Sequence, residues 1–310
     1  MTGGIRAGSG FASRHRVHAV ALDAGTDTVR LWRPDGELVE FPTPIAATRP
    51  ARARANGTAA IVDASGPAFR RRLPRLTRRR RRGFRIAATV PACAGRAARG
   101  RLETALRALN RAQPVLLMEA PLAAAAGAGL DTASARPCLV IDVGVHGSEV
   151  AVVAEGRVVD AVGCATGCRD IERAILAHLY RRHHILATPN AAWQAFHVGS
   201  ATVLHLDGDT PVAVQVSGPE LAIEISDPTA TIVSAARRLI ERAAAVPGRD
   251  PLGQSAQLVG GGALVPQLAQ TLRDELGADV HVPRDPRRAA VRGVARLIEE
   301  ADRYPQLWGD

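Results

Sequence analysis

One pattern occurs twice in this chain: an apolar strand ends in aspartate, and x-Gly and a second strand follow. The first copy is V-H-A-V-A-L-D at Val17–Asp23, before Ala24-Gly25, and the second is C-L-V-I-D at Cys138–Asp142, before Val143-Gly144. Helical and strand-like segments alternate after each copy, as in α/β proteins. The duplication predicts two similar lobes around a cleft.

Length and composition suit this division. A chain of 310 residues is long enough for two domains. No apolar run reaches the ~18 residues of a membrane-spanning helix, and Met1–Val17 lacks the apolar segment of a secretion signal, so we expect a cytoplasmic protein. Among the four cysteines only Cys164 and Cys168 lie close in sequence, and we therefore expect no cysteine-based metal site.

All basic side chains other than histidine are arginines, which carry the net charge of +10. The absence of lysine excludes Schiff-base chemistry and a P-loop lysine.

Periodicity and turn residues predict the remaining elements. The predicted strands are 17–23, 28–32, 86–90, 115–118, 138–142, 149–154, 158–162, 202–206, 212–216, 221–225, 257–259 and 279–282. The predicted helices are 97–112, 122–128, 170–182, 231–245, 265–276 and 287–300.

Three glycine-containing segments could bind a phosphorylated ligand. An aspartate that ends a strand before x-Gly presents a carboxylate beside bare backbone, which suits a hydrated divalent cation that bridges phosphates. The segment V-G-G-G-A-L at Val259–Leu264 follows a strand and opens a helix, so that a ligand can approach its backbone.

Taken in order, these segments resemble the MreB family, the rod-shape-determining branch of the actin-like ATPases, as a divergent member. The matching segments are L-D-A-G-T at 22–26, V-P at 90–91, L-L-M-E-A-P-L-A-A-A-A-G-A-G-L at 116–130, V-I-D-V-G at 140–144, S-E-V-A-V-V at 148–153, V-G-G-G-A-L-V at 259–265 and V-H-V-P-R-D-P at 280–286. The resemblance implies an α/β actin-like ATPase fold, in which duplicated ribonuclease H-like lobes surround a nucleotide cleft. Lobe I would span 17–135 and lobe II 136–300, with a tail at each end, 1–16 and 301–310.

The resemblance also implies ATP or ADP with Mg²⁺ as the ligand. The nucleotide-binding residues would be Gly25, Thr26, Asp27 and Thr28 in the first phosphate loop, Gly144, Gly147 and Ser148 in the second, and Gly260, Gly261 and Gly262 under the adenosine. Asp23 and Asp142 would reach the metal through water.

Several positions depart from the family pattern. The family's E-E-P is Glu119-Ala120-Pro121 here, so the carboxylate that family members use to position the attacking water is missing. The second phosphate loop, G-G-G-T in the family, contains Val145 and His146, and residues 187–196 lack the family's base-holding acid and lysine. Since a water-orienting group contributes about 10² to 10⁴ in rate, we expect at most a weak ATPase and no catalytic residue.

Both outer subdomains are expected to be reduced, because the segments 41–84 and 199–224 are short for the family, which leaves filament formation open. The arginine-rich stretch 70–85 has three interpretations. It could be a solvated surface, a peripheral membrane contact through Phe84, Arg81 and Arg82, or a nucleic-acid contact. Nucleic acid is least favoured, since only 3% of residues are aromatic.

The function expected from the resemblance is that of a cytoskeletal ATP-binding protein of cell shape and cell-wall morphogenesis. Its partners would be itself or other MreB-like proteins and the cell-wall synthesis machinery. Two alternatives are a sugar or acetate kinase of the same superfamily and a basic scaffold that no longer binds nucleotide.

Overall fold

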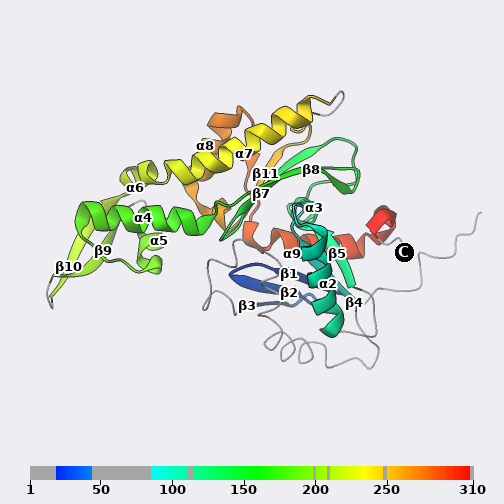
Figure 1. The fold of residues 1–310 in the computed structure, drawn as a ribbon, viewed down its shortest axis with the longest axis horizontal. Coiled ribbons are helices and arrows are strands. Elements are labelled where there is room, and N and C mark those ends of the chain that lie inside the picture. Colours follow the sequence, from blue (N-terminus) through cyan, green and yellow to red (C-terminus); the bar gives the residue numbers. More distant parts are fainter. Residues whose placement is uncertain are drawn as a thin grey trace, which may run out of the picture.

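The computed structural model describes residues 19–43, 85–109, 115–197, 200–207, 210–246 and 250–307. Its strands form two five-stranded mixed sheets and one hairpin (Figure 1). The first sheet, in the order β3-β2-β1-β4-β5, contains β1 (Ala19–Ala24), β2 (Thr28–Trp32), β3 (Leu38–Pro42), β4 (Arg85–Val90) and β5 (Val115–Glu119). The second, in the order β12-β11-β6-β7-β8, contains β6 (Cys138–Val143), β7 (Ser148–Ala154), β8 (Arg157–Cys164), β11 (Ala256–Gly260) and β12 (Val280–His281).

The two sheets repeat one arrangement around a central strand that carries the aspartate. In the first, β1 pairs antiparallel with β2 and parallel with β4. In the second, β6 pairs antiparallel with β7 and parallel with β11. The duplicated core predicted from the two Asp-x-Gly segments is therefore present.

Helices cover the sheets in layers. They are α2 (Arg96–Leu109), α3 (Ala120–Gly127), α4 (Cys168–His183), α5 (Pro189–His197), α6 (Gly218–Glu224), α7 (Ser226–Ala244), α8 (Pro266–Leu276) and α9 (Ala289–Glu299), with short 3₁₀ turns η2 (Gly261–Leu264), η3 (Pro286–Arg288), η4 (Ala301–Arg303) and η5 (Pro305–Leu307). Alternation along β1 explains the layers, because Val20 and Leu22 pack with Leu102 and Leu106 of α2, whereas Ala21 faces the cluster built on α3 and α9.

The helices α3 and α9 lie between the two sheets. Their cluster joins Ala21 of the first sheet to Val140 and Val259 of the second. On the other face of the second sheet, Leu139 and Ile141 pack in a cluster with residues of α4, α7 and α8. The helix α9 packs on β1 of the first sheet, although it follows the predicted lobe II strands in sequence. The lobe boundaries given above stay a prediction.

The helices α3 and α9 approach until their backbones touch. A Cβ at Gly293 would lie 1.6 Å from the Ala123 carbonyl oxygen, and one at Gly127 would lie 1.8 Å from the Ala289 oxygen. Only glycine fits at these two positions.

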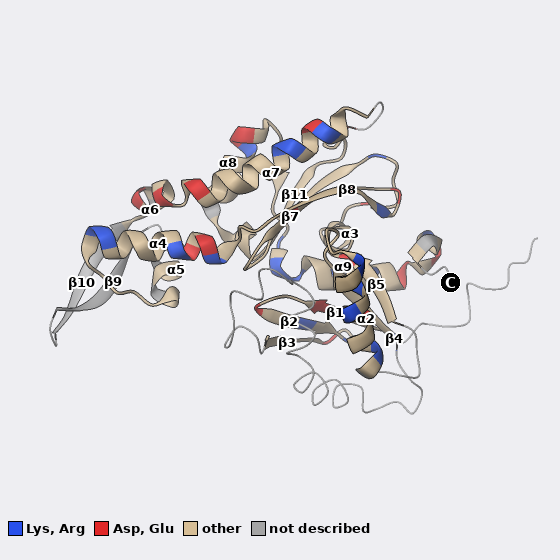
Figure 2. Cartoon of the chain, in the orientation of Figure 1, with Lys and Arg blue, Asp and Glu red and all other residues tan. Residues whose placement is uncertain are grey.

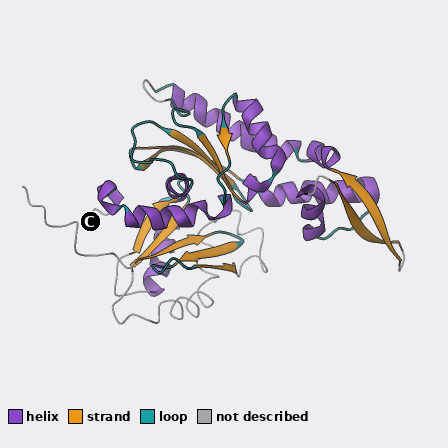
Figure 3. Ribbon diagram, turned by 180° about the vertical axis from the view of Figure 1, so that it is seen from behind, coloured by secondary structure: helices purple, strands orange, loops and turns teal. Residues whose placement is uncertain are grey.

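The remaining elements are α5, α6 and one hairpin, which together we call the outer module of the second lobe. The hairpin of β9 (Ser200–Asp207) and β10 (Thr210–Ser217) is flanked by α5 and α6 and projects at the end of the molecule remote from the first sheet (Figures 1 and 3).

One predicted strand is wrong. Residues 221–225 belong to α6 and its C-terminal boundary, because Ser217 and Glu220 form a capping box that begins a helix. Leu221 and Ile225, four residues apart, are then buried on one face. The strand β3 and the helix α5 were not predicted.

Candidate functional site

Asp23 is the penultimate residue of β1, and both of its carboxylate oxygens have partners. Its Oδ1 accepts a hydrogen bond from Thr89 Oγ1 at 2.8 Å, and its Oδ2 lies 3.2 Å from Arg30 Nη1. The same guanidinium donates through Nε to Glu40 Oε1 at 2.9 Å. Asp23 is therefore held in place, with part of its charge offset by Arg30.

Asp142 occupies the equivalent position in the second sheet. Burial, together with the negative charges of Asp23 and Glu149, raises the pKa of Asp142 from its ordinary value of 3.8 to about 7, while Arg30 acts in the opposite direction. The structure thus brings together the two aspartates that the sequence placed at a metal, one from each sheet.

The first glycine turn connects β1 to β2. Gly25 N donates to Thr28 O at 3.1 Å, and a Cβ at Gly25 would lie 2.7 Å from that oxygen. Thr43, at the end of β3, anchors the turn through its hydroxyl to Gly25 O and its amide to Asp27 O, both 2.7 Å. The exposed Asp27 accepts the hydroxyl of Thr28 at 3.1 Å, and Thr26, between Gly25 and Asp27, is partly exposed.

The second turn connects β6 to β7 and lies against the start of α4. Gly144 N donates to Gly147 O at 3.0 Å, and Cys168 N donates to Gly144 O at 2.9 Å. The Ser148 hydroxyl donates to Thr166 O at 2.6 Å. Because the Ser148 hydroxyl already donates to Thr166, the backbone of the turn is the part that is suited to contact a phosphate.

The glycine segment 260–262 packs on the end of β6. Gly260 has φ +80°, and a Cβ there would lie 2.4 Å from Asp142 Oδ1. A Cβ at Gly262 would lie 2.2 Å from Val143 Cγ1, and one at Gly261 would lie 3.5 Å from Cys168 Sγ. Side chains at 260 and 262 would collide with the aspartate strand, so the glycines are required for this contact.

Glu149 is a residue that the sequence analysis missed. Its carboxylate accepts the backbone N–H groups of Ala92 at 3.0 Å and Cys93 at 2.6 Å, in the turn after β4. It pairs with Asp142 across β6 and β7. Glu149 therefore joins the second sheet to the first beside the two aspartates; the only signal in the sequence was its position after Ser148.

The structure shows where Ala120 and Glu119 lie, and the predicted effect of Ala120 on hydrolysis stays a prediction. Ala120 begins α3, while the neighbouring Glu119 forms an ion pair with Arg99 at 2.9 Å. Arg99 also donates to Ala92 O at 3.0 Å, which holds the Glu119 carboxylate near the turn after β4.

The predicted membrane-contact residues Phe84, Arg81 and Arg82 lie outside the described residues. Within the described ranges, no helix combines the length and apolar character needed to cross a bilayer.

Two repeated sheets with their paired aspartates and glycine turns define an actin-like ATPase fold, as predicted. The profile of the family described as "MreB/Mbl protein" matches residues 38–306, and the chain belongs to that family.

Curated relatives agree with this assignment. The chain is 30% identical over 209 residues to the cell shape-determining protein MreB of Escherichia coli K12, covering 62% of this chain and 59% of the relative. It is 30% identical over 237 residues to MreB of Haemophilus influenzae Rd, covering 71% and 66%. The match thus spans less than two thirds of the length of these relatives.

Solved structures share the fold at low identity. The crystal structure of MreB5 of Spiroplasma citri bound to ADP has a TM-score of 0.79 at 16% identity, covering 94% of this chain and 98% of that one. The MamK double helical filament has a TM-score of 0.68 at 16% identity, covering 91% and 98%.

Proposed function

We propose that this protein binds ATP or ADP between its two sheets and assembles with itself or with other MreB-like proteins in cell-shape control. The observation that carries the proposal is the convergence of Asp23 and Asp142 with the turns 25–28 and 144–148 and the glycines 260–262. In this arrangement the two turns would hold the phosphates, and the glycines would lie under the adenosine. The ADP of S. citri MreB5 supports a nucleotide as ligand.

The aspartates fit a hydrated Mg²⁺ ion. Mg²⁺ prefers oxygen ligands, keeps several waters and is usually held by one or two carboxylates together with substrate phosphates. Burial, followed by the charges of Asp23 and Glu149, raises the pKa of Asp142, so this carboxyl lies where added positive charge would be favourable. When bound, Mg²⁺ would offset phosphate charge. Arg30, which already pairs with Asp23, supplies part of that positive charge itself.

We propose that hydrolysis is weak. No carboxylate is present at position 120, and Arg99 holds the neighbouring Glu119. The protein would then bind nucleotide mainly as a ligand that biases assembly.

The proposal also covers assembly, partners and cellular location. The MamK filament and the names of the curated relatives support self-association and a role in cell shape. Contacts with the cell-wall synthesis machinery and a cytoplasmic location are inferred from the family. A peripheral membrane contact would involve Phe84, Arg81 and Arg82.

Thermal unfolding with and without nucleotide tests the proposal. Ligand at 100 times its Kd stabilises a folded protein by about 2.7 kcal/mol. We expect millimolar Mg-ADP and Mg-ATP each to raise the Tm of the wild-type chain. An unchanged Tm would favour the scaffold alternative, in which the fold no longer binds nucleotide.

Replacing Asp142 with asparagine should stabilise the nucleotide-free protein at high pH. Below pH ~4 the carboxyl is protonated in both the folded and the unfolded chain. Between pH ~4 and the pKa of about 7 in the folded chain, Asp142 keeps its proton only in the folded chain. The free energy of unfolding therefore falls as the pH rises through this range. Asparagine removes this loss, and the gain in Tm over wild type should therefore be largest at pH 8 and absent near pH 4.

The same variant should lose its Tm response to Mg-ADP, because it lacks the proposed metal-facing carboxylate. Asp302→Asn, at an exposed position remote in sequence from the site, is the matched control and should change neither property. An Asp142→Asn protein that is less stable than wild type at pH 8 would contradict the electrostatic account.

A further inference from the structure

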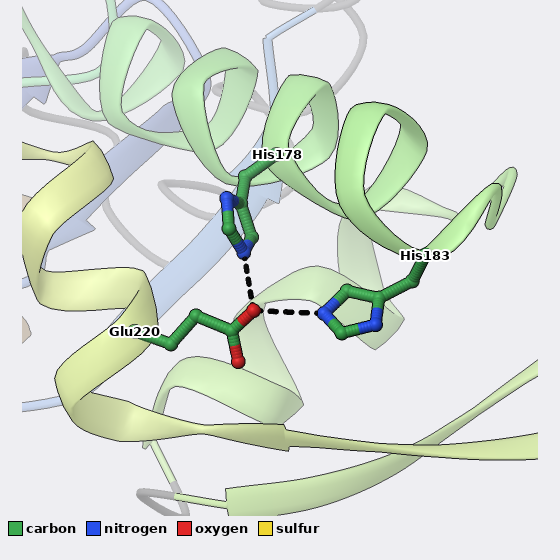
Figure 4. A group of neighbouring side chains, drawn as sticks. All are labelled: His178, His183 and Glu220. Atoms are coloured by element: carbon green, nitrogen blue, oxygen red, sulfur yellow. Dashed lines mark hydrogen bonds and ion pairs between the residues drawn. The ribbon is translucent and has the colours of Figure 1, made fainter.

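A cluster of metal-ligating side chains lies where α4 meets α6 of the outer module, apart from the paired aspartates. His178 and His183 are near the C-terminal end of α4, and Glu220 is in the first turn of α6. The Nε2 atoms of both histidines lie 2.8 Å from the same Glu220 Oε1, as Figure 4 shows. One ligand atom from each residue lies within 4.8 Å of the others.

These separations are close to those of a coordinated ion. Zinc bonds of ~2.1 Å in a tetrahedral arrangement place ligand atoms roughly 3.4 Å apart. Side-chain rotations that lengthen the two 2.8 Å N···O separations by about 0.6 Å would bring them to this spacing and admit a cation. Three protein ligands leave one coordination position for water.

The surroundings of His178 select the nitrogen that faces the cluster. Its Nδ1 lies 3.1 Å from Glu224 Oε1, and the other oxygen of Glu224 accepts from Arg181 at 2.8 Å. If Nδ1 carries the proton and donates it to Glu224, the lone pair of Nε2 points toward Glu220. A carboxylate that orients a histidine in this way is the usual outer partner of a metal-binding imidazole.

A lone pair of His178 Nε2 facing the Glu220 oxygen is unfavourable unless a proton or a cation lies between them. Among the described residues, the charged groups in contact with the cluster are Glu220, Glu224 and Arg181, so with neutral histidines their summed charge is −1, which favours a divalent cation. Acidic residues on α6 and residues of both signs on α4 are visible in Figure 2.

Burial also suits a bound ion. The side chain of His178 is 10% exposed, that of His183 19% and that of Glu220 27%. The site is thus partly shielded and still open to water on one side.

We propose that His178, His183 and Glu220 bind one divalent transition-metal cation, with Glu224 orienting His178, and that the ion fastens α4 to α6. Two imidazoles and one carboxylate favour Zn²⁺ and related transition metals over Mg²⁺ or Ca²⁺. The N-terminus of α4 contacts the turn 144–147, and His178 and His183 follow Cys168 by 10 and 15 residues, which places the cluster about 15 to 22 Å farther along the helix. This site is therefore separate from the nucleotide, and its ion would brace the module that carries the β9–β10 hairpin.

Metal titration of the 310-residue chain tests the proposal. After treatment with a chelator, Zn²⁺ is titrated by calorimetry and Co²⁺ by visible absorption. We expect one ion per chain, a tetrahedral-type cobalt spectrum without thiolate charge-transfer bands, and a Tm that rises with Zn²⁺ and falls with chelator.

Variants assign the ligands. His183→Ala and Glu220→Gln should each weaken binding at least 100-fold, and Glu224→Gln should weaken it by about 10- to 100-fold while keeping the cobalt spectrum. His281→Ala removes an exposed histidine that pairs with Asp279 and should bind like wild type.

Several results would overturn the proposal. Wild-type protein that binds no Zn²⁺ at micromolar concentration shows that hydrogen bonds alone join the two histidines to Glu220. Binding that survives both His183→Ala and Glu220→Gln, or a cobalt spectrum with thiolate bands, places the ion elsewhere. These outcomes do not depend on nucleotide binding.

Discussion

Replacing Gly293 with alanine should destabilise the protein by about 3 kcal/mol or more, a large part of the 5–15 kcal/mol that holds a typical domain folded. The added methyl group would lie 1.6 Å from the Ala123 carbonyl oxygen and 2.8 Å from Gly127 N. Both are backbone atoms, so no side-chain rotation relieves the collision. The helices α3 and α9 would have to separate, which opens the cluster that joins the two sheets. Urea unfolding followed by circular dichroism measures the change.

The matched control is Gly100→Ala, which also adds one methyl group to a helical glycine. Gly100 lies in α2, where a Cβ would meet no atom within 4 Å. Alanine is favoured over glycine in helices by about 1 kcal/mol, so this variant should be slightly more stable than wild type. If both variants shift stability in the same direction, the close contact of α3 and α9 is not as described.

Replacing Ala120 with glutamate should raise ATP hydrolysis by about 10²-fold or more, because a positioned water-orienting group contributes 10² to 10⁴ in rate. Ala120 is partly exposed at the first position of α3, so a longer side chain can be accommodated. Phosphate release at saturating Mg-ATP measures the effect.

Glu119→Gln is the control for this gain. The Glu119 carboxylate is paired with Arg99, so removing its charge should leave the slow hydrolysis of the wild type unchanged. A strong loss of hydrolysis in Glu119→Gln would mean that Glu119 serves as the missing carboxylate. An Ala120→Glu protein that binds ATP without faster turnover would show that another departure, such as Val145 or His146 in the second turn, limits the reaction.

Much of the fold could be predicted because its signals are local. Apolar runs such as 138–142 and 149–154 become strands with one face on α3 and α9 and the other on α4 and α7. The segment L-A-I-E-I at 221–225 was wrongly predicted as a strand, because its large apolar side chains stand at every second position. The capping box of Ser217 and Glu220 begins a helix immediately before this segment. A helix-capping signal can therefore outweigh the two-residue alternation of apolar side chains.

The positions of the candidate-site residues were predictable to the same extent, and their roles toward a nucleotide stay a prediction. Asp23, Asp142 and the glycines form motifs that can be read within a few residues. Contacts between distant segments could not be found in this way. Glu149, beside the aspartates, reaches amides 56 and 57 residues away, and in the separate histidine cluster His178 meets a glutamate 42 residues away. Such pairs exist only once the sheets and helices are assembled.

A crystal structure of the chain grown with Mg-ADP tests the central claim most directly. We predict nucleotide density with the phosphates between the turns 25–28 and 144–148, the adenosine against Gly260–Gly262, and the metal beside Asp23 and Asp142. Density for ADP at another place, or crystals without ADP at millimolar concentration, would contradict the account.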